Sequence, residues 1–200
     1  RQRPRPRGRL VEALDQLGER PEQGGLVVAE LAHRDRAAPT DDVITRLLAP
    51  TIDGEQITDL EFKNFFVLLV SAGNDTTRYT MAAGMKALIE HPDQMAELRD
   101  SIGKDPTVMD RAVEEILRWA TVTMHFRRTA TRDVEMHGKQ IKAGDRVVMW
   151  YLSGNRDGEA IENPDQFIID RARPRQHIPF GFGIHRCGGN RLGELQLKIR

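Results

Sequence analysis

The longest stretch with helical periodicity runs from Thr58 to His91. Thr58 and Glu61 have the spacing of a capping box, and Pro92 forbids continuation of a helix beyond His91. The pattern predicts one helix of about 34 residues, which at 1.5 Å per residue is longer than usual in globular proteins. Apolar residues cover most of its circumference, so we expect this helix to lie in the core. They are Leu60, Phe62, Phe65, Phe66, Leu68, Leu69, Ala72, Met81, Met85, Leu88 and Ile89.

The middle of this helix contains five consecutive poor helix formers, Gly73, Asn74, Asp75, Thr76 and Thr77. One interpretation is a loop that separates two shorter helices. The other is a kink or polar notch in an apolar wall, because hydroxyl and carboxylate groups compete for backbone hydrogen bonds. Such a notch could hold oxygen and water.

Other segments of the chain show shorter patterns. Helices are expected at 10–17 and 26–32, interrupted by Gly18, Pro21, Gly24 and Gly25, at 41–48, at 107–119, and from Leu192 onward. A period of two predicts a small antiparallel sheet formed by 134–136, 140–142 and 147–151. Residues 155–179 are charged and interrupted by prolines, which indicates a long ordered meander. The predicted fold class is therefore mainly α with a small antiparallel β region.

Composition narrows the possible functions. The 200 residues include 30 Lys/Arg and 30 Asp/Glu, and the resulting net charge of zero argues against a general binder of nucleic acid or acidic lipid. The lone Cys187 excludes an internal disulfide and any zinc site with several cysteines. No apolar stretch approaches the roughly 18 residues that span a bilayer, so we expect a cytoplasmic protein.

The two ends of the chain suggest a piece of something larger. It begins at Arg1 rather than Met and stops inside an amphipathic pattern at Arg200. The first ten residues hold five arginines and no acid, which is typical of a solvated tail or an anion-binding arm. We therefore expect a poorly assigned part at 1–40 and a folded portion at 41–200.

Cys187 lies in a glycine-rich segment, Phe180 to Gly189, immediately before a helical pattern. The positive end of a helix dipole and free backbone N–H groups there would stabilise negative charge on sulfur. The four glycines leave room for a large flat partner against the backbone. The residues alone allow an ordinary buried thiol, a nucleophile or a metal ligand. Zinc bound by only His185 and Cys187 would be under-coordinated.

This segment resembles the heme-binding loop of the cytochrome P450 heme-thiolate monooxygenases. Phe180, Gly183, His185, Cys187 and Gly189 fall at the family's spacing. Three further blocks occur in the family's order: residues 72–76, Glu115 to Arg118, and residues 163–167 followed by Arg171. The resemblance covers about 41–200. It implies the C-terminal part of that fold, with a long central helix, a Glu-x-x-Arg helix, a meander, a cysteine loop and a closing helix.

The resemblance also implies roles for single residues. Cys187 would be the ligand of the iron of heme b, with Phe180 beside the sulfur and Gly183 and Gly189 shaping the loop. Thr76 and Asp75 would donate and relay protons during oxygen activation. The remaining implied roles are heme propionate binding by Arg128 and His185, and a structural cluster of Glu115, Arg118 and Arg171. From spacing alone, Glu115 and Arg118 are more typical of an exposed surface pair.

The implied activity is insertion of one oxygen atom of O2 into an unactivated C–H bond. Several segments look most like the bacterial branch that hydroxylates medium-chain alkanes and fatty acids at the terminal carbon. A sterol side-chain or terpenoid hydroxylase is the alternative, and a heme-binding fragment without turnover is an alternative of another class. A hydrophobic small molecule would contact Val70, Ala72, Gly73, Val122, Thr123 and Met124, and ferredoxin with ferredoxin reductase would donate electrons.

Overall fold

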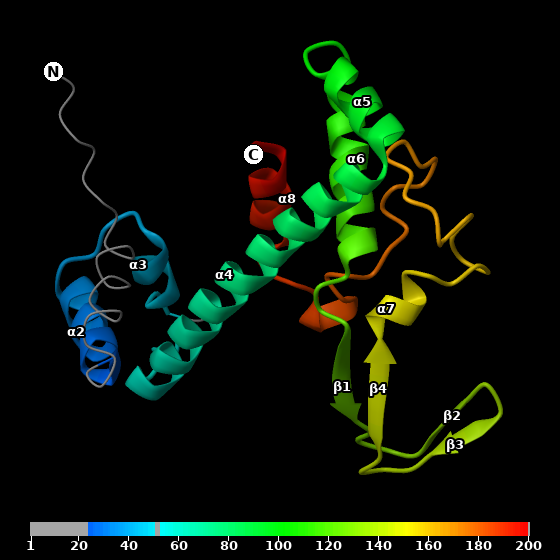
Figure 1. Cartoon of the computed structure of the whole chain (residues 1–200). Coiled ribbons are helices and arrows are strands. Elements are labelled where there is room, and N and C mark those ends of the chain that lie inside the picture. The colour runs from blue at the N-terminus through cyan, green and yellow to red at the C-terminus, as the bar shows by residue number, and fades with distance from the viewer. Residues whose placement is uncertain (1–23, 51–52, 200) are drawn as a thin grey trace, which may run out of the picture. The chain divides into compact units, whose positions relative to one another are not determined.

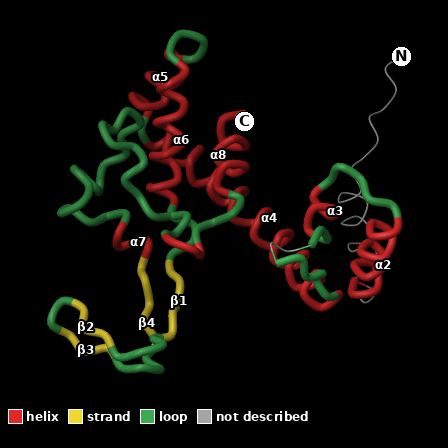
Figure 2. Tube along the Cα trace, turned by 180° about the vertical axis from the view of Figure 1, so that it is seen from behind, coloured by secondary structure: helices red, strands yellow, loops and turns green. Residues whose placement is uncertain are grey.

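The computed structural model describes residues 24–50 and 53–199 (Figure 1). The predicted helix at 10–17 and the arginine-rich start lie outside these residues. The chain divides into two compact units, Arg1–Ala72 and Gly73–Arg200, which we describe separately. The described part is mainly helical with short antiparallel ladders, as the sequence predicts (Figure 2).

The first unit contains α2 (Gly24–Ala37), α3 (Val43–Leu47) and the start of α4 (Asp59–Glu90). Asp42 caps α3, because its carboxylate accepts the Thr45 N–H at 2.9 Å. The helix predicted at 26–32 begins two residues earlier than expected, since Gly24 and Gly25 belong to α2. Glycine weakens a helix mainly in its interior, and these two residues occupy the first turn. The core of the unit consists of Val28, Ala32, Ile44, Leu48, Phe62 and Phe66.

Helix α4 begins with the predicted capping box. The Glu61 carboxylate accepts the Thr58 N–H at 2.9 Å, and the Thr58 hydroxyl accepts the Glu61 N–H at 3.3 Å. The 32-residue helix is continuous through residues 73–77, so the interpretation as two helices separated by a loop is wrong. The Thr80 hydroxyl donates to the Thr76 carbonyl at 2.8 Å, a side-chain bond that accompanies the helical ladder in this polar segment.

The expectation that α4 is buried on all sides is wrong. Its buried side chains are Phe62 and Phe66 in the first unit and Thr80, Ala87 and Leu88 in the second. Among the described residues, too few elements surround α4 to cover a helix of this length. Its exposed apolar residues are Leu60, Phe65, Val67, Leu68, Leu69, Tyr79, Met85 and Ile89.

The second unit packs α5 (Pro92–Ser101), α6 (Pro106–Ala120) and α8 (Asn190–Ile199) with the end of α4. Helix α5 was not expected, because Pro92 marked only the end of α4. Proline also suits the first position of a new helix, since its missing N–H has no partner there anyway. The core consists of Ala87, Leu88, Val108, Ala112, Phe167 and Ile169. The last two belong to the irregular segment 155–179, which is ordered, as predicted.

Two separate antiparallel ladders replace the predicted single sheet. Strand β1 (His125–Thr129) pairs with β4 (Arg146–Trp150), and β2 (Val134–Met136) pairs with β3 (Lys139–Ile141). His125 lies opposite Trp150, and Thr129 lies opposite Arg146. The β2–β3 turn has positive φ at His137 and Gly138, the backbone that a tight hairpin requires. Strand β1 was missed because its residues do not alternate between apolar and polar.

None of the helices in the described part of the chain is both long and apolar enough to cross a membrane.

Two glycines of α4 allow a direct test of helix packing. A Cβ at Gly84 would lie 2.6 Å from Ile116 Cγ2 of α6, whereas a Cβ at Gly73 would have no atom within 4 Å. The branched Ile116 side chain is stiff, so overpacking of about 1–3 kcal/mol exceeds the helix-propensity gain of about 0.5–1 kcal/mol. We expect Gly84→Ala to destabilise the protein and Gly73→Ala to stabilise it, as measured by urea unfolding. Equal changes in the free energy of unfolding for the two variants would contradict the close packing of α4 on α6 at Gly84.

Candidate functional site

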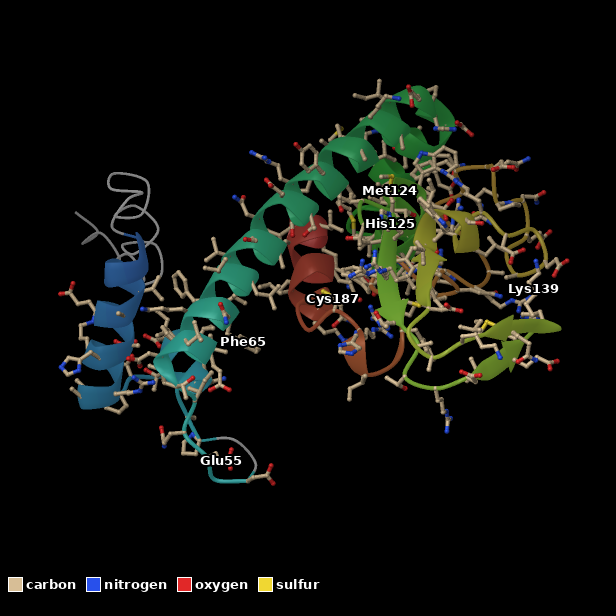
Figure 3. The ribbon with its side chains drawn as sticks, turned by 90° about the horizontal axis from the view of Figure 1, so that it is seen from below. Glu55, Phe65, Met124, His125, Lys139 and Cys187 are labelled. Carbon is tan, nitrogen blue, oxygen red and sulfur yellow. The ribbon has the colours of Figure 1, made fainter. Side chains whose placement is uncertain are left out.

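Cys187 lies on a loop between a short 3-10 helix, η2 (Gly183–His185), and α8 (Figure 3). Backbone hydrogen bonds shape this loop. The Cys187 N–H donates to the Phe180 carbonyl at 2.9 Å, and the Arg186 N–H donates to the Gly183 carbonyl at 3.0 Å. The position of Phe180 therefore sets the position of the cysteine.

Two glycines of the loop are required by backbone geometry. Gly181 has φ +71° and Gly183 has φ +75°, in the left-handed region that side chains disfavour. A Cβ at Gly181 would also lie 2.9 Å from the hydroxyl of Tyr151 in α7 (Tyr151–Gly154). Around Gly183, Gly188 and Gly189 the space is open, with no atom within 4 Å of a Cβ. One side of the loop can therefore accept a group pressed against the backbone.

The thiol and its apolar neighbours are exposed. Cys187 is exposed, so the interpretation of an ordinary buried thiol is wrong. Phe182 is 86% exposed and Ile184 is 96% exposed. Within the ranges 24–50 and 53–199, no three His, Cys, Asp or Glu side chains are grouped to hold a metal ion by themselves. The loop thus offers one sulfur donor beside an uncovered apolar surface.

Arg128 and His185 lie on neighbouring segments. The cysteine loop and β1, which carries Arg128, are side by side in two views of the second unit (Figures 1 and 3). Arg128 is half-buried, donates from Nη1 to the Arg127 carbonyl at 3.0 Å, and lies 5.9 Å from the Phe126 ring centroid. His185, in η2, is exposed. Both remain predicted ligands of the propionates.

Glu115, Arg118 and Arg171 form one buried cluster. The Glu115 carboxylate accepts from Arg118 Nη2 at 2.7 Å and from Arg171 Nε at 2.8 Å, and the Glu115 and Arg118 side chains are each 1% exposed. The arginines also donate to backbone carbonyls of the meander, those of Asn155, Glu162, Asn163, Pro164 and Gln166. The pair of α6 residues is therefore an internal support and not a surface bridge.

Asn155 connects this cluster to the cysteine loop, a role that sequence reasoning missed. It is fully buried, and its carbonyl accepts from Arg118 Nη1 at 2.9 Å. Its side chain donates to the Thr121 hydroxyl at 2.9 Å and accepts the Ile178 N–H at 2.8 Å. No periodicity marks such a residue, because its partners lie 34 and 23 positions away in sequence.

The predicted oxygen-activating and pocket residues lie on two segments. Asp75 is exposed and pairs with Arg78 at 2.7 Å, while Thr76 is half-buried on the same helix. Val70 and Ala72 belong to the first unit and Gly73 to the second. Val122, Thr123 and Met124 connect α6 to β1, and Met124 is 52% exposed. The roles of all these residues stay predictions.

The residues of the loop fit a heme. Thiolate sulfur is a soft ligand for iron, a single sulfur suffices when a macrocycle supplies the remaining ligands, and the open glycine face with exposed Phe182 and Ile184 suits a flat apolar group. Arg128 and His185 supply donors for carboxylates. These features define the class of heme-thiolate proteins.

Comparisons with known proteins agree with a chain that binds heme. The pattern of the cytochrome P450 family matches residues 27–200, so the chain belongs to the cytochrome P450 family, whose cofactor is heme b. It is 43% identical over 171 residues to the steroid C26-monooxygenase of Mycobacterium tuberculosis, covering 85% of this chain and 38% of that protein. It is 38% identical over 164 residues to cytochrome P450-terp of Pseudomonas sp, covering 82% of this chain and 37% of the relative.

A solved structure shows the same fold. The Mycobacterium marinum cytochrome P450 CYP268A2, in complex with pseudoionone, superposes with a TM-score of 0.81 at 42% identity. The alignment covers 92% of this chain and 44% of that one. The chain thus spans less than half the length of these relatives.

The buried cluster leads to a stability prediction. Arg171→Met leaves the Glu115 carboxylate with one arginine and removes donors from the carbonyls of the meander, so we expect a loss of about 3–5 kcal/mol in the free energy of unfolding. Glu90→Gln is the matched control, because it breaks the exposed Glu90–Lys86 pair of α4 and should change stability by less than about 0.5 kcal/mol. Urea unfolding of the full-length protein measures both. A loss of less than 1 kcal/mol for Arg171→Met would contradict a supporting role for the cluster.

Proposed function

We propose that this chain forms the C-terminal, heme-binding portion of a monooxygenase that inserts one oxygen atom of O2 into an unactivated C–H bond of a hydrophobic small molecule. The observation that carries the proposal is the exposed Cys187 on an open glycine loop, in a chain of the cytochrome P450 family. Bound heme would supply the oxygen-activating chemistry. The alternative of another class is a heme-binding fragment without turnover.

Different residues of the chain would bind the iron, bind the rest of the heme and transfer protons. Cys187 would donate its thiolate to iron, with the loop fixed by the Cys187 N–H bond to the Phe180 carbonyl. Gly183 and Gly189 would leave space for the heme, and Arg128 and His185 would donate to its carboxylates. On α4, the Thr76 hydroxyl would hold a proton near the site of oxygen binding. The exposed Asp75 would exchange protons with solvent, since its partner Arg78 is exposed as well.

The substrate we propose is the side chain of a steroid or sterol. The sequence pattern favours terminal hydroxylation of alkanes or fatty acids, but the names of the similar proteins support the alternative better. The mycobacterial relative at 43% identity is named for oxidation of a steroid at C26. A terpenoid is the second candidate, favoured by the similarity to cytochrome P450-terp.

Electrons would come from a separate ferredoxin and its reductase. The resemblance to the family implies these electron donors, and the one cysteine of these 200 residues is the proposed ligand of the heme iron.

The first test concerns the thiolate. In the full-length protein loaded with heme, the reduced carbon monoxide complex should show the absorption band of a thiolate-ligated heme. Cys187→Ser should abolish this band, because a serine hydroxyl remains protonated and is a poor ligand for iron. His33→Gln, an exposed change on α2, is the control and should leave the band intact. Absence of the band from the unmodified protein would refute the assignment of the site.

The second test concerns the substrate. The purified protein, supplied with ferredoxin and reductase, is incubated with matched panels of steroids, terpenoids, alkanes and fatty acids, and the products are identified by mass spectrometry. We expect hydroxylated steroid to exceed hydroxylated alkane at least tenfold. With that steroid, Thr76→Ala should lower product formed per O2 consumed. Turnover of alkanes or fatty acids alone would refute the steroid proposal, and no turnover of any panel would favour the fragment without activity.

A further inference from the structure

A second buried ionic cluster lies next to the first on α6. Glu114 accepts from His177 Nε2 at 2.8 Å and from Arg175 Nε at 2.8 Å. The side chains of Glu114 and His177 are 6% and 5% exposed. Because successive residues of a helix point about 100° apart, the side chains of Glu114 and Glu115 contact different partners. The described function gives this second carboxylate no role.

The cluster extends to α8. Glu194 of α8 is 7% exposed on its side chain and lies 3.4 Å from Arg175 Nη2 and 3.5 Å from Arg191 Nη1. Arg175 therefore lies between two largely buried carboxylates, one on α6 and one on α8. At the surface, Lys198 of α8 adds an ion pair with Asp110 of α6 at 2.7 Å. The charged groups that surround His177 thus come from α6, α8 and the segment 175–178.

This segment leads directly into the cysteine loop. His177 precedes Ile178, whose N–H donates to Asn155 and whose carbonyl accepts the Gly181 N–H at 2.9 Å. The Ile178 side chain also packs closely on α7, since a Cβ at Gly154 would lie 2.7 Å from its Cδ1. A displacement of His177 would therefore move Phe180, whose carbonyl accepts the Cys187 N–H.

We propose that His177 and Glu114 are positioning residues for Cys187, which fix the segment ahead of the loop between α6 and α8 and thereby keep the thiolate in place to bind iron. The proposal rests on the proposed heme-thiolate function. Its physical basis is the cost of leaving a buried carboxylate without its donor: without His177, Glu114 retains only Arg175, whose side chain is 61% exposed. Moving the segment outward, where water can solvate the carboxylate, would relieve that cost.

The pKa of Glu114 supports a charged cluster at neutral pH. Burial by itself raises this pKa, but the hydrogen bonds and charges of His177 and Arg175 together outweigh burial and bring the pKa below its ordinary value. A carboxyl group with a lowered pKa stabilises the folded protein above its ordinary pKa, and the contribution disappears as the pH falls through the lowered value. The Glu114 carboxylate should therefore be charged at pH 7, and its contribution should be lost only in acid, as the pH falls through the lowered pKa.

The test compares three variants of the full-length, heme-loaded protein during a urea titration. The thiolate-ligated band of the carbon monoxide complex reports the cysteine, and far-UV circular dichroism reports the helices. For His177→Phe we expect the thiolate-ligated fraction to fall at least twofold at urea concentrations that leave the helical signal intact. His177→Gln retains an N–H donor for Glu114 and should restore most of that fraction. Glu114→Gln removes the charge and should give an intermediate loss.

Each outcome decides the proposal. The exposed change His33→Gln is the control for replacement of a histidine and should match the unmodified protein. Parallel loss of the band and the helical signal in His177→Phe would show a purely structural role and overturn the proposal, as would an unchanged thiolate fraction. If His177→Phe does not accumulate as folded protein, Glu114→Gln decides by the same criterion. A missing thiolate band in the unmodified protein would refute the proposed function instead.

Discussion

One carboxylate shared by two arginines supports much of the second unit. Segment 155–179 contains no long helix or sheet ladder, so its backbone carbonyls lack the regular partners that secondary structure provides. Arg118 and Arg171 supply these partners from their guanidinium groups, while the Glu115 carboxylate forms an ion pair with each of them. An irregular segment can thus lie over a core that includes Phe167 and Ile169, because buried polar groups are tolerated when they are paired. The ionic cluster replaces a sheet or helix as the organiser of this region.

The cysteine loop is connected to the cluster of Glu115, Arg118 and Arg171 through the segment that precedes the loop. Asn155 is bonded both to Arg118 and to the backbone N–H of Ile178, and Glu114 of the second cluster is bonded to the adjacent His177. A loop whose glycines favour conformational freedom would otherwise lose considerable entropy on becoming ordered around a ligand. Two anchors on the preceding segment reduce that loss by restricting the loop before any ligand binds. The exposed sulfur is therefore presented by a buried polar framework, although little of the loop itself is buried.

The features that could be predicted from the sequence are those formed by residues close together in the sequence. The capping box at Thr58 and Glu61 uses side chains three positions apart, α6 shows a regular apolar stripe, and the Cys187 loop is a compact motif. No supporting role was predicted for Asn155, Glu114 or His177, because their partners lie 23 to 63 positions away and no local pattern records such contacts. The exposure of α4 was missed for a related reason. Apolar periodicity shows which side chains need cover, whereas burial depends on which elements are present to supply it.

The residues proposed to hold the iron ligand and some of those proposed to contact substrate lie on different segments. The proposed iron ligand depends on polar contacts among α6, the meander and α8, and all of these lie within the second unit. Three of the residues proposed to contact substrate, Val122, Thr123 and Met124, lie on the segment that leaves α6 toward β1, beyond the left-handed Thr121 that ends the helix. Thr121 contacts the framework through its hydroxyl, which accepts from Asn155 and donates to the Arg118 carbonyl. Side chains after this residue can therefore change in size and polarity without disturbing the clusters that hold Cys187. Under the proposed roles, substrate selectivity and iron ligation would therefore depend on different sets of contacts.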